Sequence, residues 1–398
     1  MDVEQIRKDF PVLEDKKNIY FDNACMSLKP RPVVEAMQEY YYEYPACAGR
    51  SNHRFGEMVT KKMTEARKTV ADFFGAKENE IIFLRNATEG LNLVAKSLDL
   101  KSGDVVLTTD REHNSNLIIW QQLVKQKGII HNVVPSKADN TFDLEKFKEM
   151  LASEVKVVSV VYTSNLDGVS VPMQEIINLA HQNGSLVMLD AAQAAPHKRI
   201  DVKKLDVDFL ALSGHKMCGP TGTGVLFVKE SLFDRLSPYN VGGDTVEYST
   251  YEDHKMLSGP HKFEAGLQDY AGIIGLGAAC KYLNEVGFDF IAEQEEKLNT
   301  YITEELLKLK KVKIIGPENP HERSGIISFN VDGMDYHQIS LLLNNMSGVM
   351  IRSGQHCVHS WFNAHGIKGS ARASVYFYNT LEEAKVFVET LKKIVLIA

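Results

Sequence analysis

An aspartate and a lysine at the ends of two consecutive predicted strands are the residues of this sequence best suited to chemistry. The apolar run 186–190 ends in Asp190, and the next run, 207–213, leads through Ser213 to Lys216. Alone, Asp190 is more often a helix N-cap and Lys216 a solvated loop residue. Together they suit pyridoxal phosphate, which needs an amine to bond its aldehyde and a carboxylate to keep its ring nitrogen protonated. The pair therefore predicts a pyridoxal-phosphate site.

Three further groups are suited to the phosphate of such a cofactor. Ser213 and His215 flank the same strand end, within a glycine-rich loop that would let the backbone approach a ligand. Thr88 lies in the turn after the apolar run 81–84, where a helix begins, so it offers both a backbone N–H and a hydroxyl. A threonine that only caps the helix would have the same local geometry.

Two other strand ends carry polar side chains. His113 follows the run 104–109 and could stack on a flat ring, although an isolated loop histidine is more often a bystander. Asn165 follows the run 156–163 and could bind a ring hydroxyl or form an Asx turn. Ligands of open α/β sheets bind beyond the carboxyl ends of the strands. Polar groups at five strand ends therefore favour one flat, anionic cofactor.

The elements that must position these groups form a mostly parallel sheet. Short β-rich runs alternate with helical patterns at 89–98, 143–153 and 174–183, and the runs are 81–84, 104–109, 156–163, 186–190, 207–213 and 224–228. Most of these runs are continuously apolar, which is typical of strands buried on both faces. The sequence therefore predicts an α/β fold with crossover helices.

The pattern changes after residue 285. A charged helix at about 291–310 is followed by four strand-like runs and two more helices; the runs are 311–315, 325–331, 349–352 and 372–378, and the helices lie near 335–346 and from 381. This order favours a smaller α+β domain. We predict a large cofactor domain at 16–285 and a small domain made of 1–15 and 286–398.

The composition excludes several classes of protein. The chain has 398 residues, of which 44% are hydrophobic and 24% charged, so wholesale disorder is ruled out. With 45 basic and 52 acidic residues, the net charge of −7 argues against a dedicated nucleic-acid binder. No apolar stretch has the length of a membrane span and the N-terminus lacks a signal core. We expect a cytoplasmic protein without a metal site.

The five cysteines are too few and too scattered for a disulfide framework and predict a reducing compartment. Four of them are interpreted as small packing residues, namely Cys25, Cys47, Cys218 and Cys280. Cys357 differs because His356, His359 and Arg352 are close to it in sequence. Such a polar, cation-rich loop is typical of reactive thiols.

The sequence resembles the class V aminotransferases of the fold-type I pyridoxal-phosphate enzymes, and among them the SufS-type (group II) cysteine desulfurases. The resemblance runs from residue 20 to the C-terminal helix and rests on these segments: YFDNA, ATEGLNLVA, REHNSNLIIWQ, TSNLDG, LDAAQAAPH, LSGHKMCGPTGTGVLFV, FEAG, GIIGLGAA, RSGQHC and RASVYFYNT. It implies a homodimer with active sites near the subunit interface.

The resemblance implies a role for each matching residue. Lys216 is the cofactor lysine, Asp190 the partner of the ring nitrogen and His113 the stacking residue, with His113 also able to move protons. Gln193 and Asn165 adjoin the ring hydroxyl, and the phosphate ligands are Thr88, Ser213 and His215.

The resemblance further implies that Cys357 accepts sulfur from L-cysteine as a persulfide, leaving L-alanine, and that Arg372 holds the substrate carboxylate. Arg352, Asn23 and His53 join the substrate site. A sulfur-acceptor protein is expected, for example in iron–sulfur cluster assembly. The alternative is a selenocysteine lyase, or another class V lyase or epimerase without persulfide chemistry.

The chain departs from the family pattern in three places. Ala87 and Leu267 stand where the family has threonines, which implies modestly weaker phosphate binding. The run Cys25-Met26-Ser27 replaces the usual small residues after Ala24. The lysine–aspartate pair is untouched by these changes.

Overall fold

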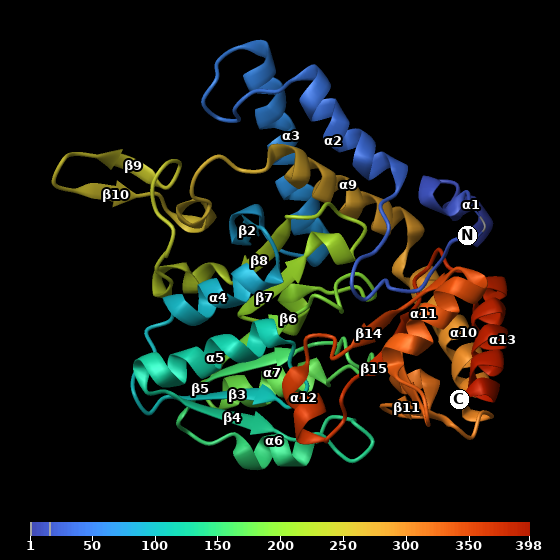
Figure 1. The fold of residues 1–398 in the computed structure, drawn as a ribbon. Coiled ribbons are helices and arrows are strands. Elements are labelled where there is room, and N and C mark those ends of the chain that lie inside the picture. The colour runs from blue at the N-terminus through green and yellow to red at the C-terminus, as the bar shows by residue number, and fades with distance from the viewer. Residues whose placement is uncertain (1, 16) are drawn as a thin grey trace.

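A seven-stranded sheet forms the centre of the computed structural model, which describes residues 2–15 and 17–398 (Figure 1). The strand order is β2-β8-β7-β6-β5-β3-β4, and the strands are β2 (Ile81–Leu84), β3 (Val105–Thr109), β4 (Ile130–Val134), β5 (Val155–Val161), β6 (Leu186–Asp190), β7 (Phe209–Ser213) and β8 (Gly224–Val228). From β7 to β4 all neighbours are parallel, whereas β8 is antiparallel to both of its neighbours. The predicted α/β class is confirmed.

The six strands predicted for the large sheet agree closely with the observed ones, whereas the run predicted at 372–378 is a strand only at Ser370–Ser374. Three have the predicted bounds, and the other three differ by no more than two residues at either end. The edge strand β4 was not predicted, because its sequence IHNVV is partly polar and most of its side chains are at least partly exposed. An apolar run therefore identifies a central strand better than an edge strand.

Helices cover both faces of this sheet, which explains the continuously apolar strands. Alternate residues of each strand enter two separate cores: Leu210 and Leu212 join one, whereas Phe209 and Ala211 join the other. The first core is covered by α3 (Arg54–Phe74), α7 (Met173–Gln182) and α9 (Tyr270–Val286), and the second by α4 (Ala87–Ser97) and α5 (Asn114–Lys127). A Cβ at Gly90 of α4 would lie 3.1 Å from the Ala211 Cβ, so α4 lies directly on the sheet.

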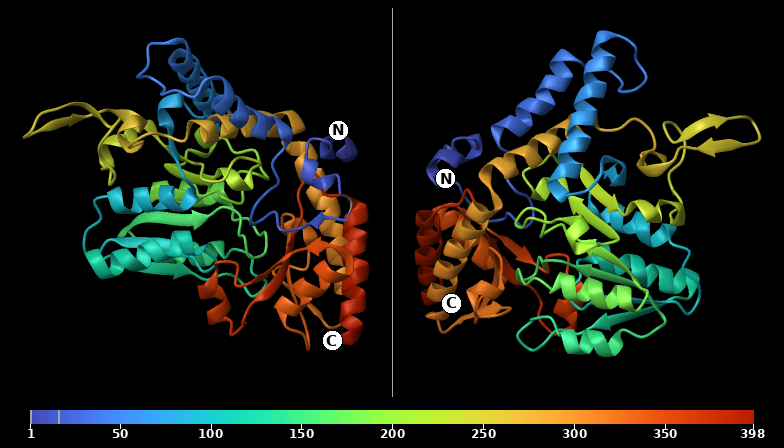
Figure 2. Two further views of the ribbon diagram at one scale, coloured as in Figure 1. Left: turned by 45° about the horizontal axis from the view of Figure 1, so that its top comes forward. Right: turned by 180° about the vertical axis from the view of Figure 1, so that it is seen from behind.

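A second, four-stranded sheet lies beside the first and is antiparallel throughout. Its order is β11-β12-β15-β14, formed by β11 (Val312–Ile315), β12 (Ile326–Val331), β15 (Ser370–Ser374) and β14 (Arg352–Gly354). Three helices pack around it, as both views of Figure 2 show: α10 (Phe288–Leu307), α11 (Tyr336–Ser347) and α13 (Leu381–Ile397). The run predicted as one strand at 349–352 is divided between β13 (Val349–Met350) and β14.

The N-terminal residues contact both parts of the molecule. Phe10, just after α1 (Val3–Arg7), packs against Tyr282 of α9 and against Tyr378. The short strand β1 (Ile19–Tyr20) pairs in parallel with β13. The division into a large domain at 16–285 and a small domain made of 1–15 and 286–398 therefore stays a proposal. The segments before and after the boundary at residue 15 both contact the small domain.

The remaining elements lie around these two sheets. They are α2 (Arg31–Glu43), α6 (Leu144–Met150), α8 (Val202–Leu205), α12 (His359–Ala364) and the hairpin of β9 (Val246–Ser249) and β10 (His254–Met256), which projects from the body of the molecule (Figure 1). Among the described residues, no helix combines the length and apolar character needed to cross a membrane.

Candidate active site

Residues far apart in the sequence meet in a cavity of about 250 Å³ where the carboxyl ends of the parallel strands face β14 and β15. All but two of the predicted site residues line it: Thr88, His113, Asn165, Asp190, Gln193, Ser213, His215, Lys216, Arg352, Cys357 and Arg372. The parallel register explains this convergence, because β6 and β7 pair with Asp190 opposite Ala211, and their ends lie side by side.

Asp190 and Lys216 both line the cavity and influence each other's charge. Asp190 is 3% exposed, and one carboxylate oxygen accepts from the Ala192 N–H at 3.0 Å. Burial raises the pKa of Asp190, while Lys216 acts in the opposite sense. Burial lowers the pKa of Lys216, while Asp190 raises it. The segment after Asp190 consists of turns rather than a helix, so this hydrogen bond is not a helix cap, and the charge of Lys216 also acts on the carboxylate.

Two of the predicted phosphate ligands, Thr88 and Ser213, lie at the N-terminus of α4, and the third, His215, lines the same cavity. Asn86 caps this helix through the Glu89 N–H at 3.0 Å, and the Ala87 N–H donates to Ser213 Oγ at 2.9 Å. Thr88 is exposed, and its hydroxyl lies 2.7 Å from Ser115 Oγ. Helix N-termini favour anions because their first N–H groups lack intrahelical partners. This end of the cavity is therefore suited to a phosphate.

His113 is held as a neutral ring. Burial, with the charges of Lys216 and Arg372, lowers its pKa to about 3. Its Nδ1 accepts from the Ser115 N–H at 3.1 Å, so the ring proton lies on Nε2. A neutral imidazole with a fixed tautomer can stack on a flat ring and donate from Nε2.

Asn165 and Gln193 are buried amides that bind backbone carbonyls through their side-chain nitrogen atoms. Asn165 Nδ2 donates to the His356 carbonyl at 2.7 Å, and Gln193 Nε2 donates to the Ala24 carbonyl at 2.6 Å. Within the described residues, Asn165 Oδ1 and Gln193 Oε1 have no hydrogen-bond partner. Buried polar atoms are normally paired, so these two oxygens indicate a site for a polar ligand.

The Cys357 loop has an unusual backbone. His356 and Cys357 have φ values of 48° and 59°, a left-handed conformation that is uncommon in consecutive non-glycine residues. Three hydrogen bonds hold this loop. Asn165 donates to the His356 carbonyl, and the Asn114 N–H donates to the Cys357 carbonyl at 2.8 Å. His356 Nε2 lies 2.9 Å from Ser370 Oγ. The strained loop is thus fixed from three elements, and the half-buried thiol of Cys357 faces the cavity.

Two arginines supply positive charge next to this thiol. Arg372 is 2% exposed, donates from Nη1 to the Asn165 carbonyl at 2.9 Å and lies 3.4 Å from Asp22. Its Nε has no partner among the residues that the structure describes. Arg352 reaches the cavity from β14. A buried guanidinium with a free N–H is suited to bind a carboxylate.

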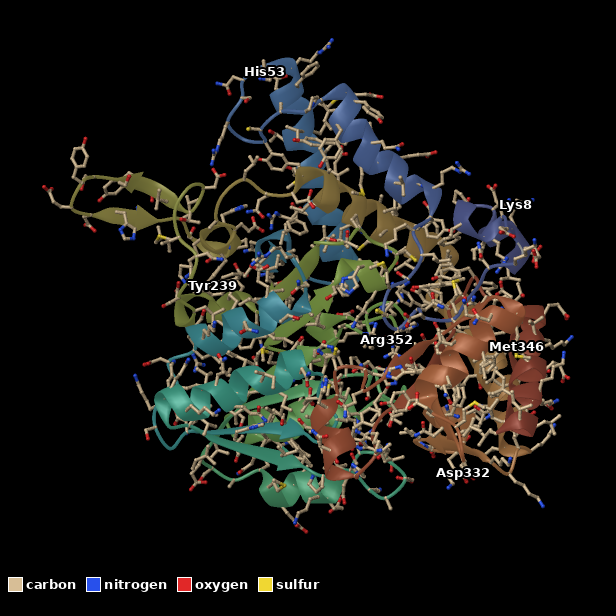
Figure 3. The ribbon with its side chains drawn as sticks, in the orientation of Figure 1. Lys8, His53, Tyr239, Asp332, Met346 and Arg352 are labelled. Atoms are coloured by element: carbon tan, nitrogen blue, oxygen red, sulfur yellow. The ribbon has the colours of Figure 1, made fainter. Side chains whose placement is uncertain are left out.

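Two predicted substrate residues do not line the cavity. Asn23 is buried and supports the backbone instead, donating to the Ser374 carbonyl at 2.7 Å and accepting from the Tyr378 hydroxyl. His53 is exposed and caps α3 through the Gly56 N–H at 3.3 Å. Figure 3 shows His53 at the top of the molecule, away from Arg352 near its middle. Within one chain, the prediction that these two residues reach the substrate is not supported.

Sequence reasoning missed four side chains of the cavity that carry polar or sulfur atoms: Cys25, Asn86, Ser115 and His356. Cys25 and Cys47 are half-buried rather than packed in a core, so their interpretation as packing residues is corrected, whereas Cys218 and Cys280 are buried as expected. A signal for Cys25 was present, because it interrupts the small-residue run that follows Ala24.

Known proteins resemble this chain over almost its whole length. A family model for aminotransferase class-V matches residues 19–387. A probable cysteine desulfurase from Pyrococcus abyssi is 40% identical over 395 residues, which are 98% of this chain and 97% of that protein. The apo structure of a cysteine desulfurase from Thermococcus onnurineus NA1 has a TM-score of 0.96 and 41% identity, covering 99% of this chain and 98% of its own. A cysteine desulfurase structure from Escherichia coli has a TM-score of 0.93 and 31% identity, covering 100% and 99%.

Proposed function

The chain belongs to the aminotransferase class-V family, and on that premise we propose that it is a pyridoxal-phosphate-dependent cysteine desulfurase. It converts L-cysteine to L-alanine and keeps the sulfur atom as a persulfide on Cys357. The single observation that carries the proposal is the meeting of Lys216, Cys357 and Arg372 in one cavity. Similar chains that are named cysteine desulfurases support the same conclusion.

The residues of the cavity fit pyridoxal phosphate. Its ring nitrogen would lie with Asp190, whose buried carboxylate is stabilised by a cation. The partnerless amide oxygens of Asn165 and Gln193 would face its polar substituents, and the start of α4 with Ser213 and His215 would hold its phosphate. The bound cofactor supplies an aldehyde that bonds amines and a ring that takes up the electron pair released at the substrate Cα.

Arg372 and Arg352 orient the substrate. Their guanidinium groups line the side of the cavity next to Cys357, and the free Nε–H of Arg372 provides a donor for the substrate carboxylate. A substrate carboxylate bound there would leave the substrate Cα and sulfur in the cavity that Lys216 and Cys357 also line. Holding the reacting groups in a fixed orientation lowers the entropic cost of reaching the transition state.

Lys216 and Cys357 perform the covalent steps. Burial lowers the pKa of Lys216, so its amine can take the Cα proton and return it to the product. Cys357 Sγ attacks the substrate sulfur, the bond between that sulfur and the substrate carbon breaks, and L-alanine leaves. The thiol of Cys357 becomes a persulfide, and no external oxidant is consumed. His113 presents Nε2–H as a proton donor within the cavity.

Three wider proposals accompany the activity. We propose a homodimer, because exposed apolar side chains cluster on the projecting hairpin and the segments near it, namely Tyr239, Val241, Tyr248, Tyr251 and Leu267. We also propose a partner protein with a thiol that collects the persulfide sulfur, for example for iron–sulfur clusters. The third proposal is a cytoplasmic location. Sedimentation of the purified protein tests the dimer, and a monomer would contradict it.

The activity is tested by measuring L-alanine and sulfide from L-cysteine, with a reductant, for the purified holoprotein. We expect both products in equal amounts, and loss of sulfur transfer in Cys357→Ala but not in Cys47→Ala, which lies outside the cavity. Full cysteine activity in Cys357→Ala would overturn the persulfide role. Turnover of L-selenocysteine alone would identify a selenocysteine lyase instead.

A further inference from the structure

We infer that Cys25 is a second sulfur acceptor within the cavity, which takes the persulfide sulfur from Cys357 and frees Cys357 for another turnover. The inference rests on the proposed desulfurase function and goes beyond it, since neither the family resemblance nor the reaction requires a thiol at residue 25.

Cys25 and Cys357 belong to one cavity although 332 positions separate them. Cys25 lies in the loop that follows β1, and its side chain is half-buried. Arg352 Nη1 donates to Cys25 Sγ at 2.7 Å. Arg352 begins β14, and the strand leads directly into the loop of Cys357. The segment that positions Cys357 therefore also fixes the sulfur of Cys25.

Lys216 lines the same cavity as both cysteines. Burial lowers the pKa of Lys216, whereas Asp190, Cys25 and Cys357 each act to raise it. All three side chains line the same space of about 250 Å³. A sulfur atom delivered to Cys357 therefore arrives in the cavity that Cys25 also lines.

The cavity also contains a buried cation that is suited to bind an anionic group. Arg372 is 2% exposed, lines the cavity together with both cysteines, and has an Nε without a partner among the described residues. With Arg352, which also lines the cavity, it supplies positive charge in the space that the two thiols share. Such charge favours the anionic sulfur species that form during transfer.

The transfer is a thiol exchange that needs no added reactant. Cys25 Sγ attacks the outer sulfur of the Cys357 persulfide, a bond forms between Cys25 Sγ and that sulfur, and its bond to Cys357 Sγ breaks. The proton of the Cys25 thiol passes to the departing Cys357 sulfur. The transferred atom keeps its oxidation state, and Cys357 is again a free thiol.

The number of sulfur atoms stored per chain tests the inference. Holoprotein is mixed with L-cysteine without reductant or acceptor protein, and L-alanine is measured in the first burst. We expect about two equivalents of alanine per chain, one for each thiol, and about one equivalent for Cys25→Ser and Cys25→Ala. The matched control, Cys47→Ser, should keep two. A burst of one in the unmodified protein overturns the relay, whereas no burst at all overturns the proposed desulfurase.

Peptide mass spectrometry after alkylation locates the sulfur. We expect an added sulfur atom on both Cys25 and Cys357 in the unmodified protein, and on neither in Cys357→Ala. An added sulfur on Cys25 in Cys357→Ala would show that Cys25 attacks the substrate itself, which contradicts transfer from Cys357.

A short crosslinker tests the geometry without any turnover. Dibromobimane becomes fluorescent when it bridges two neighbouring thiols, and we expect it to join the peptides of Cys25 and Cys357. The Cys25→Ser variant should lose this crosslink while its melting temperature stays close to that of the unmodified protein. A folded, unmodified protein that gives no such crosslink would contradict the arrangement.

Discussion

Asn165 Nδ2 donates to the carbonyl oxygen of His356 at 2.7 Å, so a loop that follows β5 holds the backbone of the residue before Cys357. Asn165 also accepts at its own carbonyl from Arg372 Nη1, at 2.9 Å. One residue therefore links the strand ends of the seven-stranded sheet, the thiol loop and the arginine predicted to bind substrate. The three parts of the site keep their relative positions through this link.

Replacing Asn165 with Ala should impair the chemical step more than the binding of L-cysteine. The loss of one buried hydrogen bond costs about 1.5 kcal/mol, which corresponds to about a tenfold lower kcat if the thiol loop is released. Steady-state rates of L-alanine release give both kcat and the KM for L-cysteine. The exposed Asn345→Ala variant serves as control, and an unchanged kcat for Asn165→Ala would show that the loop does not depend on this bond.

Replacing Asp190 with Asn should abolish most of the activity while the fold persists. The variant keeps the shape and the Ala192 hydrogen bond but removes the buried charge that the cofactor ring nitrogen needs. Loss of a buried charge pair is worth about 3 kcal/mol or more, so kcat should fall at least about 100-fold. Cofactor absorbance and alanine release together check this result. Near-normal turnover, at the level of the exposed control Asp332→Asn, would refute it.

Replacing Arg372 with Lys should raise the KM for L-cysteine. Lysine keeps the charge but lacks the planar fork, so it cannot hold both the Asn165 carbonyl and a carboxylate. We expect kcat/KM to fall by about 100-fold, chiefly through KM. Initial rates over a range of L-cysteine concentrations measure kcat and KM separately. A drop in kcat alone would place Arg372 outside the carboxylate site.

The stability of the protein should decrease as the pH falls below 6.5, in part because of His356. Burial, with the charges of Arg372 and Arg352, lowers the pKa of His356 from 6.5 to about 2. Below pH 6.5 the unfolded chain therefore binds a proton that the folded chain does not, and stability falls by up to about 1.4 kcal/mol per pH unit. Above pH 6.5 the group has no effect on stability.

Urea unfolding between pH 5 and 7.5 measures this contribution, with His356→Gln as the comparison. The variant cannot titrate, so its free energy of unfolding should depend less steeply on pH than that of the unmodified protein. The exposed His321→Gln variant should keep the original slope. Parallel curves for His356→Gln and the unmodified protein would contradict the buried neutral histidine.

The sequence predicts those parts of the site that lie at strand ends. Asp190 and Lys216 follow apolar runs, and the parallel register of β6 and β7 brings their loops together. Cys25 could not be found in this way, because it lies in an irregular loop and reaches the cavity only through long-range contacts such as that with Arg352. The orientation of Asn165 toward the thiol loop also depends on the packing of the two sheets, which no local pattern encodes.

The central claim is that Cys357 accepts the sulfur of L-cysteine. Mass spectrometry of the Cys357 peptide, after brief incubation of the holoprotein with L-cysteine and alkylation, tests it most directly. We predict an added sulfur atom on this peptide that appears together with L-alanine and disappears on treatment with reductant. Formation of L-alanine with no added sulfur on Cys357 at any time would contradict the account.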